Sequence, residues 1–112
     1  MSVCLKTLAQ LSKMMRGKFP ALLEKYLCET DELITRLTTS DSAEERVRAA
    51  HSIKSTAASF GALHLSSLAA EYEACHGSSA LAEQLRREFA LVTAEFKSYL
   101  ASLNEPCVRV AP

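Results

Sequence analysis

The chain has few residues that interrupt helices and no pattern typical of a strand. Only three glycines and three prolines occur among its 112 residues, and tryptophan is absent. No window alternates apolar and polar residues with the period of two that a half-buried strand shows. The sequence therefore predicts an all-α protein.

The chain also lacks a net charge and a long apolar run. Its 13 basic and 13 acidic residues balance, and the longest basic cluster is Arg86-Arg87. A surface that binds nucleic acid or an anionic membrane needs a concentrated basic patch, so we expect neither partner. No apolar run approaches the ~20 residues of a membrane span. The segment 1–15 carries two lysines within a helical pattern, which is unlike a signal peptide.

Four cysteines, Cys4, Cys28, Cys75 and Cys107, are widely spaced and include no C-x-x-C pair. An even number permits disulfides, but a chain of this length can bury a core without them. We therefore expect reduced thiols and a cytoplasmic location.

Apolar residues recur at intervals of three and four along most of the chain, which is typical of amphipathic helices. The predicted helices span about 3–16, 20–38, 43–60, 62–76 and 79–103. Ser42 and Glu45 form a capping-box pattern at the start of the third helix, and Gly61 and Gly77 are placed to end the third and fourth.

Short connections favour antiparallel neighbours, so we expect an antiparallel up-and-down four-helix bundle with an additional N-terminal helix. The chain is the length of a single domain, 1–112, with the bundle core at about 18–103 and a flexible tail at 104–112.

The most informative segment runs from His51 to Ala62. It places His51 within the third helix, Lys54 three residues later, and then only small side chains before Phe60-Gly61. Residues three and four apart share a helix face, so Lys54 and Ser55 lie beside His51. A helical histidine is most often a half-buried structural residue. The run of small residues lowers helix propensity, however, and suits a histidine that another macromolecule must approach closely.

The run 49–54 (AAHSIK), the small residues after it and Phe60-Gly61 together resemble the histidine phosphotransfer (HPt) domain of two-component phosphorelays. The segment is also similar to the phosphorylated N-terminal domain of chemotaxis histidine kinases. The resemblance extends through Leu65, Leu68 and Glu73.

The resemblance implies that His51 is the phospho-acceptor and that Lys54 stabilises the phosphoryl group. Family members usually have glycine at the position of Ser55, so the serine is a departure at the contact point. Gly61 would end the helix, and Ser59 and Phe60 would pack. The expected partner-binding residues are Arg48, Ser52, Ser55, Ala58 and Ser59.

Glu73 lies 22 positions after His51, where many HPt domains have glutamine and the chemotaxis-kinase version has glutamate. The resemblance implies that it accepts a hydrogen bond from the inner ring nitrogen of His51. A carboxylate there selects the tautomer and raises the nucleophilicity of the other nitrogen. The alternative interpretation of Glu73 is a solvated surface carboxylate.

The function implied is that of a phosphorelay intermediate, which accepts a phosphoryl group on His51 and passes it to a response-regulator receiver aspartate. The expected partners are that receiver domain and an upstream hybrid sensor histidine kinase. The chain has no glycine-rich nucleotide loop and no dense acidic cluster for Mg²⁺, so we expect a carrier without kinase activity of its own, with Mg²⁺ supplied by the receiver. We expect a monomer.

Two other functions remain open from the residues. A helical adaptor could bind a signalling partner without phosphoryl chemistry, with His51 merely structural. A metal site could use His51, His64, Cys75 and His76, but their spacing matches no common zinc pattern, and we expect none.

Overall fold

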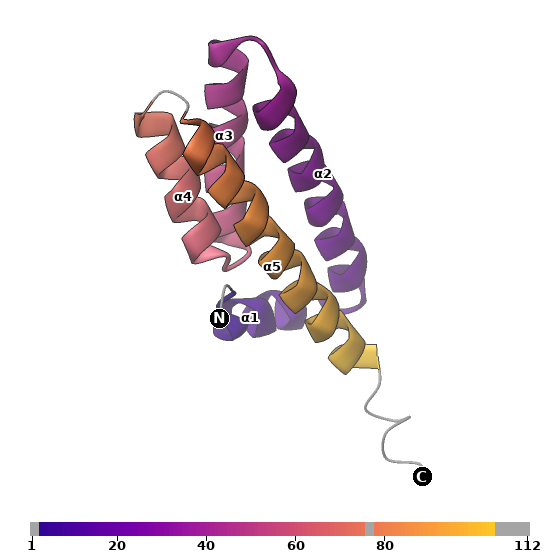
Figure 1. The fold of residues 1–112 in the computed structure, drawn as a ribbon. Helices are drawn as coiled ribbons and strands as arrows, with labels where there is room; N and C mark the ends of the chain where they lie inside the picture. Colours follow the sequence, from indigo (N-terminus) through magenta and orange to yellow (C-terminus); the bar gives the residue numbers. More distant parts are fainter. Residues whose placement is uncertain (1–2, 76–77, 105–112) are drawn as a thin grey trace.

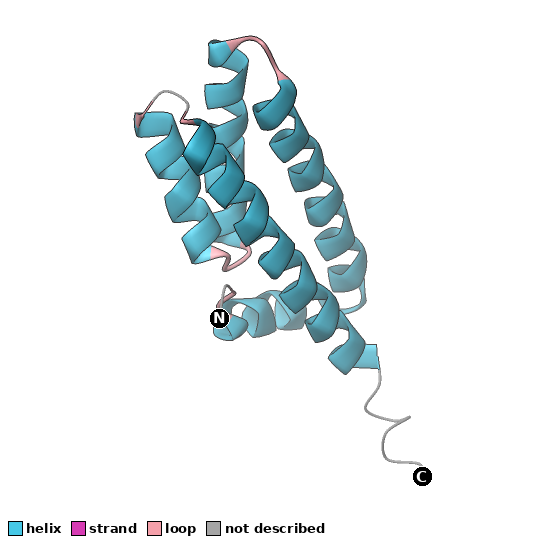
Figure 2. Ribbon diagram, in the orientation of Figure 1, coloured by secondary structure: helices cyan, strands magenta, loops and turns pink. Residues whose placement is uncertain are grey.

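The computed structural model describes residues 3–75 and 78–104, and within them every regular element is a helix (Figures 1 and 2). The elements are α1 (Leu5–Met15), the 3₁₀ turn η1 (Arg16–Lys18), α2 (Phe19–Thr39), α3 (Ala43–Ser59), α4 (Leu63–Ala74) and α5 (Ser79–Asn104). Helices α2 to α5 run alternately up and down, and α1 lies across one end of them (Figure 1). The predicted fold class, an antiparallel four-helix bundle with an additional N-terminal helix, is confirmed.

The helix boundaries differ from the predicted ones by one or two residues at most ends. Asn104 belongs to α5 and not to a tail, whereas the rest of the expected tail, 105–112, lies outside the described residues, as do His76 and Gly77. Cys4, Cys28 and Cys75 are free thiols, and Cys107 lies outside the described residues. No helix in the described part of the chain combines the length and apolar character that a membrane span requires.

The junction between α1 and α2 is the short turn η1. Arg16 takes the positive φ of 52° that ends α1. Pro20 lies in the first turn of α2, where its missing N–H costs nothing. Within α1, Leu8 is buried and Leu5 is 45% exposed.

The core is filled by the inward faces of α2 and α5, which contribute most of its bulk. Rings from the two helices meet in pairs: Phe19 and Tyr99 pack edge to face with centroids 6.1 Å apart, and Tyr26 and Phe96 lie 5.8 Å apart. Leu85, Phe89 and Val92 extend this face along α5. Such rings bury large apolar areas, and the burial of apolar area favours folding.

Helix α3 begins after Ser42, the predicted N-terminal cap, and Ser40 also takes part in the capping hydrogen bonds. The backbone N–H of Glu45 donates to Ser42 Oγ at 3.3 Å, as in a capping box. The reciprocal bond is relayed through Ser40, whose hydroxyl accepts from the Ser42 N–H and donates to the Glu45 carboxylate. Three side chains therefore hold the start of the helix that carries His51.

The turn after α3 links the bundle to α1. Gly61 has a φ of 82°, and a Cβ there would lie 3.0 Å from Thr7 Cβ and 3.1 Å from the Cys4 carbonyl oxygen. The Gly61 carbonyl accepts a hydrogen bond from the Cys4 N–H at 2.8 Å. Phe60 stacks on Tyr26 with ring centroids 4.3 Å apart. These contacts place the end of α3 between α1 and the aromatic core.

Candidate functional site

Helix α3 holds His51 outside the core because the buried residues of this helix lie on a different face. Ala50, Ile53 and Ala57 are buried, since they recur at three- and four-residue intervals on the face toward the bundle. His51 lies on the flank of that face, and its side chain is 59% exposed. The imidazole is therefore within reach of a second macromolecule.

The inner edge of the imidazole faces Glu73 on α4. His51 Nδ1 lies 3.0 Å from Glu73 Oε2, and the ring forms no other hydrogen bond with the described residues. Because an ionised carboxylate only accepts hydrogen bonds, the contact favours the tautomer with its proton on Nδ1. That leaves Nε2 with a free lone pair on the open side of the ring.

Glu73 also binds the cation that the sequence placed beside His51. Lys54 Nζ lies 3.0 Å from Glu73 Oε1, so the two carboxylate oxygens contact the two candidate residues of α3 separately. The sequence paired Lys54 with His51 by spacing alone and did not predict its contact with Glu73. Glu73 is a 27% exposed side chain and not a solvated surface carboxylate.

The electrostatics of the site keep Glu73 ionised. The Lys54 ammonium lowers the pKa of the Glu73 carboxyl below its ordinary value, partial burial opposes this, and the hydrogen bond with His51 lowers the pKa further. An ionised Glu73 is the form that accepts from both neighbours.

A further contact, absent from the sequence-based prediction, aligns the two helices. Ser66 Oγ on α4 donates to the Lys54 carbonyl oxygen on α3 at 2.9 Å. Ser66 precedes Glu73 by seven residues, which is two helical turns and therefore the same face of α4. That spacing is the signal that could have identified Ser66, once α3 and α4 were known to be antiparallel neighbours.

The residues expected to face a partner form an exposed strip of α3. All five are exposed: Arg48, Ser52, Ser55, Ala58 and Ser59. The expectation that Ser59 packs is wrong, because its hydroxyl instead donates to the Ser55 carbonyl oxygen at the surface. On the adjoining helix, Leu63 adds an apolar side chain that is 59% exposed.

Within the described residues, no cluster of three or more histidine, cysteine or acidic side chains is placed to hold a metal ion. His51 and His64 are both exposed, and Cys75 is an exposed thiol at the end of α4. His76, the fourth residue considered as a ligand, lies outside the described part of the chain.

Comparisons with known proteins identify the family of this chain. A protein-family model described as the Hpt domain matches residues 21–105. The structure is similar to the crystal structure of histidine-containing phosphotransfer protein B (HptB) from Pseudomonas aeruginosa PAO1, with a TM-score of 0.82 and 29% sequence identity. That match covers 88% of this chain and 93% of the other. No match was found among curated proteins.

The matched region begins in α2 and contains α3 and α4 with the entire His51–Glu73–Lys54 arrangement. The chain belongs to the Hpt domain family, and its function is that of a histidine phosphotransfer intermediate in a phosphorelay.

Proposed function

We propose that His51 is the phospho-acceptor and that it exchanges a phosphoryl group with the aspartate of a response-regulator receiver domain. The observation that carries this proposal is the 3.0 Å contact between His51 Nδ1 and Glu73, which in the neutral imidazole favours the tautomer whose Nε2 carries the lone pair. Nε2 is then the nucleophile.

The proposed step needs no base. The Nε2 lone pair attacks phosphorus in line, the N–P bond forms, and the bond from phosphorus to the aspartyl oxygen breaks, so the carboxylate leaves with the electron pair. The Nδ1 proton stays in place. The positive charge that the ring gains lies beside the Glu73 carboxylate, which stabilises it. The reverse step returns the phosphoryl group to a receiver aspartate by the same path.

We propose that two charged side chains, Lys54 and Glu73, position the phosphoryl group and the imidazole. Lys54 is within one turn of His51, and its flexible side chain can move from Glu73 to the phosphoryl oxygens as they arrive. Glu73 is the positioning residue of the imidazole. We propose that the receiver supplies Mg²⁺, because the described residues place no further acidic side chain beside Glu73 to hold the ion.

The exposed strip of α3 and Leu63 form the docking surface in this proposal. The small side chains of Ser55 and Ala58 allow a receiver active site to approach His51 closely. The upstream hybrid histidine kinase would dock there through its own receiver domain. We further propose a cytoplasmic monomer that carries the phosphoryl group without making it from ATP.

The test is transfer from a phosphorylated receiver to the purified protein, followed by treatment of the product with acid and base. We expect a label that is labile in acid and stable in base, as a phosphoramidate is, and absent in His51→Gln. His64→Gln is the matched control, because His64 is an exposed histidine of α4 outside the site, and it should accept label normally. Binding of several receivers without label from any of them would favour the adaptor.

A further inference from the structure

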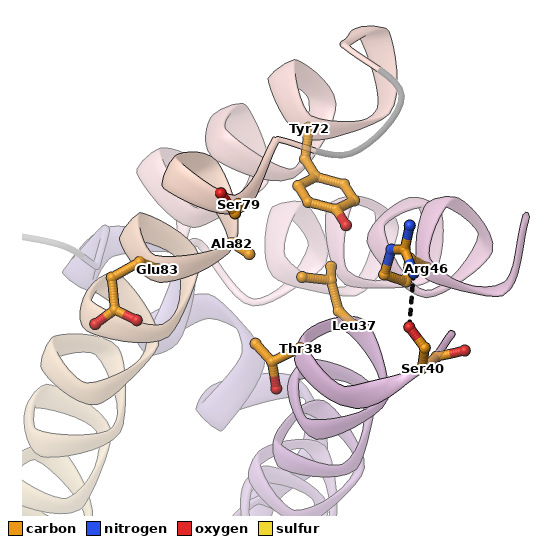
Figure 3. A pocket seen from close by; sticks show the side chains of 8 residues that line it. All are labelled: Leu37, Thr38, Ser40, Arg46, Tyr72, Ser79, Ala82 and Glu83. Carbon is orange, nitrogen blue, oxygen red and sulfur yellow. Dashed lines mark hydrogen bonds between the residues drawn. The ribbon is translucent and has the colours of Figure 1, made fainter. Parts of the chain in front are cut away.

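A cavity of about 380 Å³, whose lining side chains are drawn in Figure 3, opens at the end of the bundle opposite α1. It lies between the end of α2, the first turns of α3 and α5, and the last turn of α4. This volume falls in the range of small-molecule sites. The lining residues are Leu37, Thr38, Ser40, Arg46, Tyr72, Ser79, Ala82 and Glu83, none of which belongs to the site around His51.

Tyr72 presents an unpaired hydroxyl to this cavity. The residue is 2% exposed, and Figure 3 shows its hydroxyl directed into the space beside Arg46 and Leu37. No described residue forms a hydrogen bond with it. The ring is buried but the hydroxyl oxygen is accessible from the cavity, so it can donate a hydrogen bond to a ligand oxygen there.

Arg46 adds a positive charge that no described carboxylate neutralises. One of its nitrogens, Nη1, donates to the Ser40 carbonyl oxygen at 2.6 Å, which holds the guanidinium at the cavity (Figure 3). By contrast, the neighbouring Arg48 forms an ion pair with Glu44 at 2.8 Å. The guanidinium of Arg46 retains further N–H donors for a ligand.

The remaining wall of the cavity also favours a negative charge. Ser79 begins α5, whose first turn contains no acidic residue, so no side-chain charge offsets the partial positive charge of that helix end, although the Ser78 hydroxyl accepts from the Leu81 N–H. Glu83 is the acidic residue of the lining, and Arg86 at 3.0 Å and Arg87 at 3.5 Å neutralise it.

We propose that this cavity binds a small free anion through its phosphate or carboxylate group, with the Arg46 guanidinium and the Tyr72 hydroxyl as donors. The planar guanidinium matches the oxygens of either group. The site does not depend on phosphotransfer, because it shares no side chain with His51, Lys54 or Glu73.

The experiment is a titration of the full chain with inorganic phosphate and, separately, with succinate, followed through backbone amide signals in ¹⁵N NMR spectra. Sodium chloride at equal ionic strength is the reference. We expect saturable shifts around Arg46, Tyr72 and Ser79 with at least one anion. Saturation by phosphate alone identifies a phosphate site, and saturation by succinate alone identifies a carboxylate site.

Variants of Arg46 and Tyr72 test whether these two side chains bind the anion. Arg46→Gln should raise the half-saturating concentration by about tenfold or more, because a charge-assisted bond is lost, and Tyr72→Phe by about threefold. Arg36→Gln, at an exposed position of α2 that does not line this cavity, should bind as the parent does. Tyr72→Phe removes a hydroxyl that has no hydrogen-bond partner among the described residues, so it should fold even if Arg46→Gln does not. Shifts that follow ionic strength alone, or equal binding by the parent, Arg46→Gln and Tyr72→Phe, would overturn the proposal.

Discussion

The α3–α4 pair and the α2–α5 pair make their contacts with different kinds of side chain. Between α3 and α4, small buried residues such as Ala50, Ala57 and Ala69 let the helices approach closely, and polar side chains bridge them at the edge. Between α2 and α5, the contacts are made by rings, as in the Phe19–Tyr99 pair. The difference shows a division of tasks: bulk apolar burial stabilises the bundle, while the polar bridges position His51.

Substitution of an aromatic core residue tests whether the α2–α5 pair stabilises the bundle, and it should have the largest effect of the changes considered. Phe96 is fully buried on α5 and contacts Tyr26 and Phe60. We expect Phe96→Ala to lower the free energy of unfolding by about 3–5 kcal/mol through lost burial and a cavity. Urea denaturation measures it, with Leu91→Ala, an exposed α5 position, as the control. The fraction that remains folded should transfer phosphate at the parent rate, and a folded variant with impaired transfer would contradict the division of tasks.

A bulky residue on the exposed strip of α3 should impair transfer and leave stability unchanged. Ser55 is exposed one turn after His51, so Ser55→Arg should leave the unfolding free energy unchanged. It should slow transfer from a receiver by about a hundredfold or more, because the aspartate can no longer reach in-line geometry. Transfer kinetics measure this, and Gln84→Arg, at an exposed position of α5, is the control. A parent-like rate in Ser55→Arg would move the docking surface elsewhere.

Removal of the charge of Glu73 should have a smaller effect on transfer. Glu73→Gln keeps an oxygen acceptor but loses the charge that stabilises the phosphorylated ring, so we expect transfer to slow by about fivefold to tenfold. Glu71→Gln, at an exposed position of the same helix, should transfer normally. An unchanged rate in Glu73→Gln would remove Glu73 from the mechanism.

The same variant changes how stability depends on pH. Lys54 chiefly lowers the pKa of Glu73 in the folded state, so the contribution of Glu73 to stability is complete above its unfolded-state pKa and is lost as the pH falls through the lowered folded-state value. Glu73→Gln should therefore lose less stability than Glu71→Gln on acidification through that range, as measured by urea denaturation. Identical acid profiles would contradict the ion pair with Lys54.

The smallest effect is expected at the bond that aligns the helices. Ser66→Ala removes the donor to the Lys54 carbonyl, which should lower the unfolding free energy by about 1 kcal/mol. Ser67→Ala, at an exposed position one residue on, is the control. In NMR spectra, the His51 ring nitrogens should show a weaker preference for the Nδ1–H tautomer in Ser66→Ala. An unchanged tautomer would limit Ser66 to a structural role.

Much of this molecule followed from the sequence alone, because local rules decide it. The spacing of apolar residues determined the helices, and Ser42 and Gly61 marked the two ends of α3. The run of small residues after His51 indicated that another macromolecule could approach it closely. The motif around His51 indicated the family, since those residues are contiguous.

The contacts between helices could be identified only from the tertiary structure. The sequence could place Lys54 beside His51, but only the antiparallel packing of α3 and α4 brings Glu73 between them and Ser66 against the Lys54 carbonyl. The cavity at Arg46 and Tyr72 likewise joins four helices whose facing residues no local pattern relates. The physical reason is that helix propensity and capping act within a few residues, whereas the register of two helices depends on the whole packed interface.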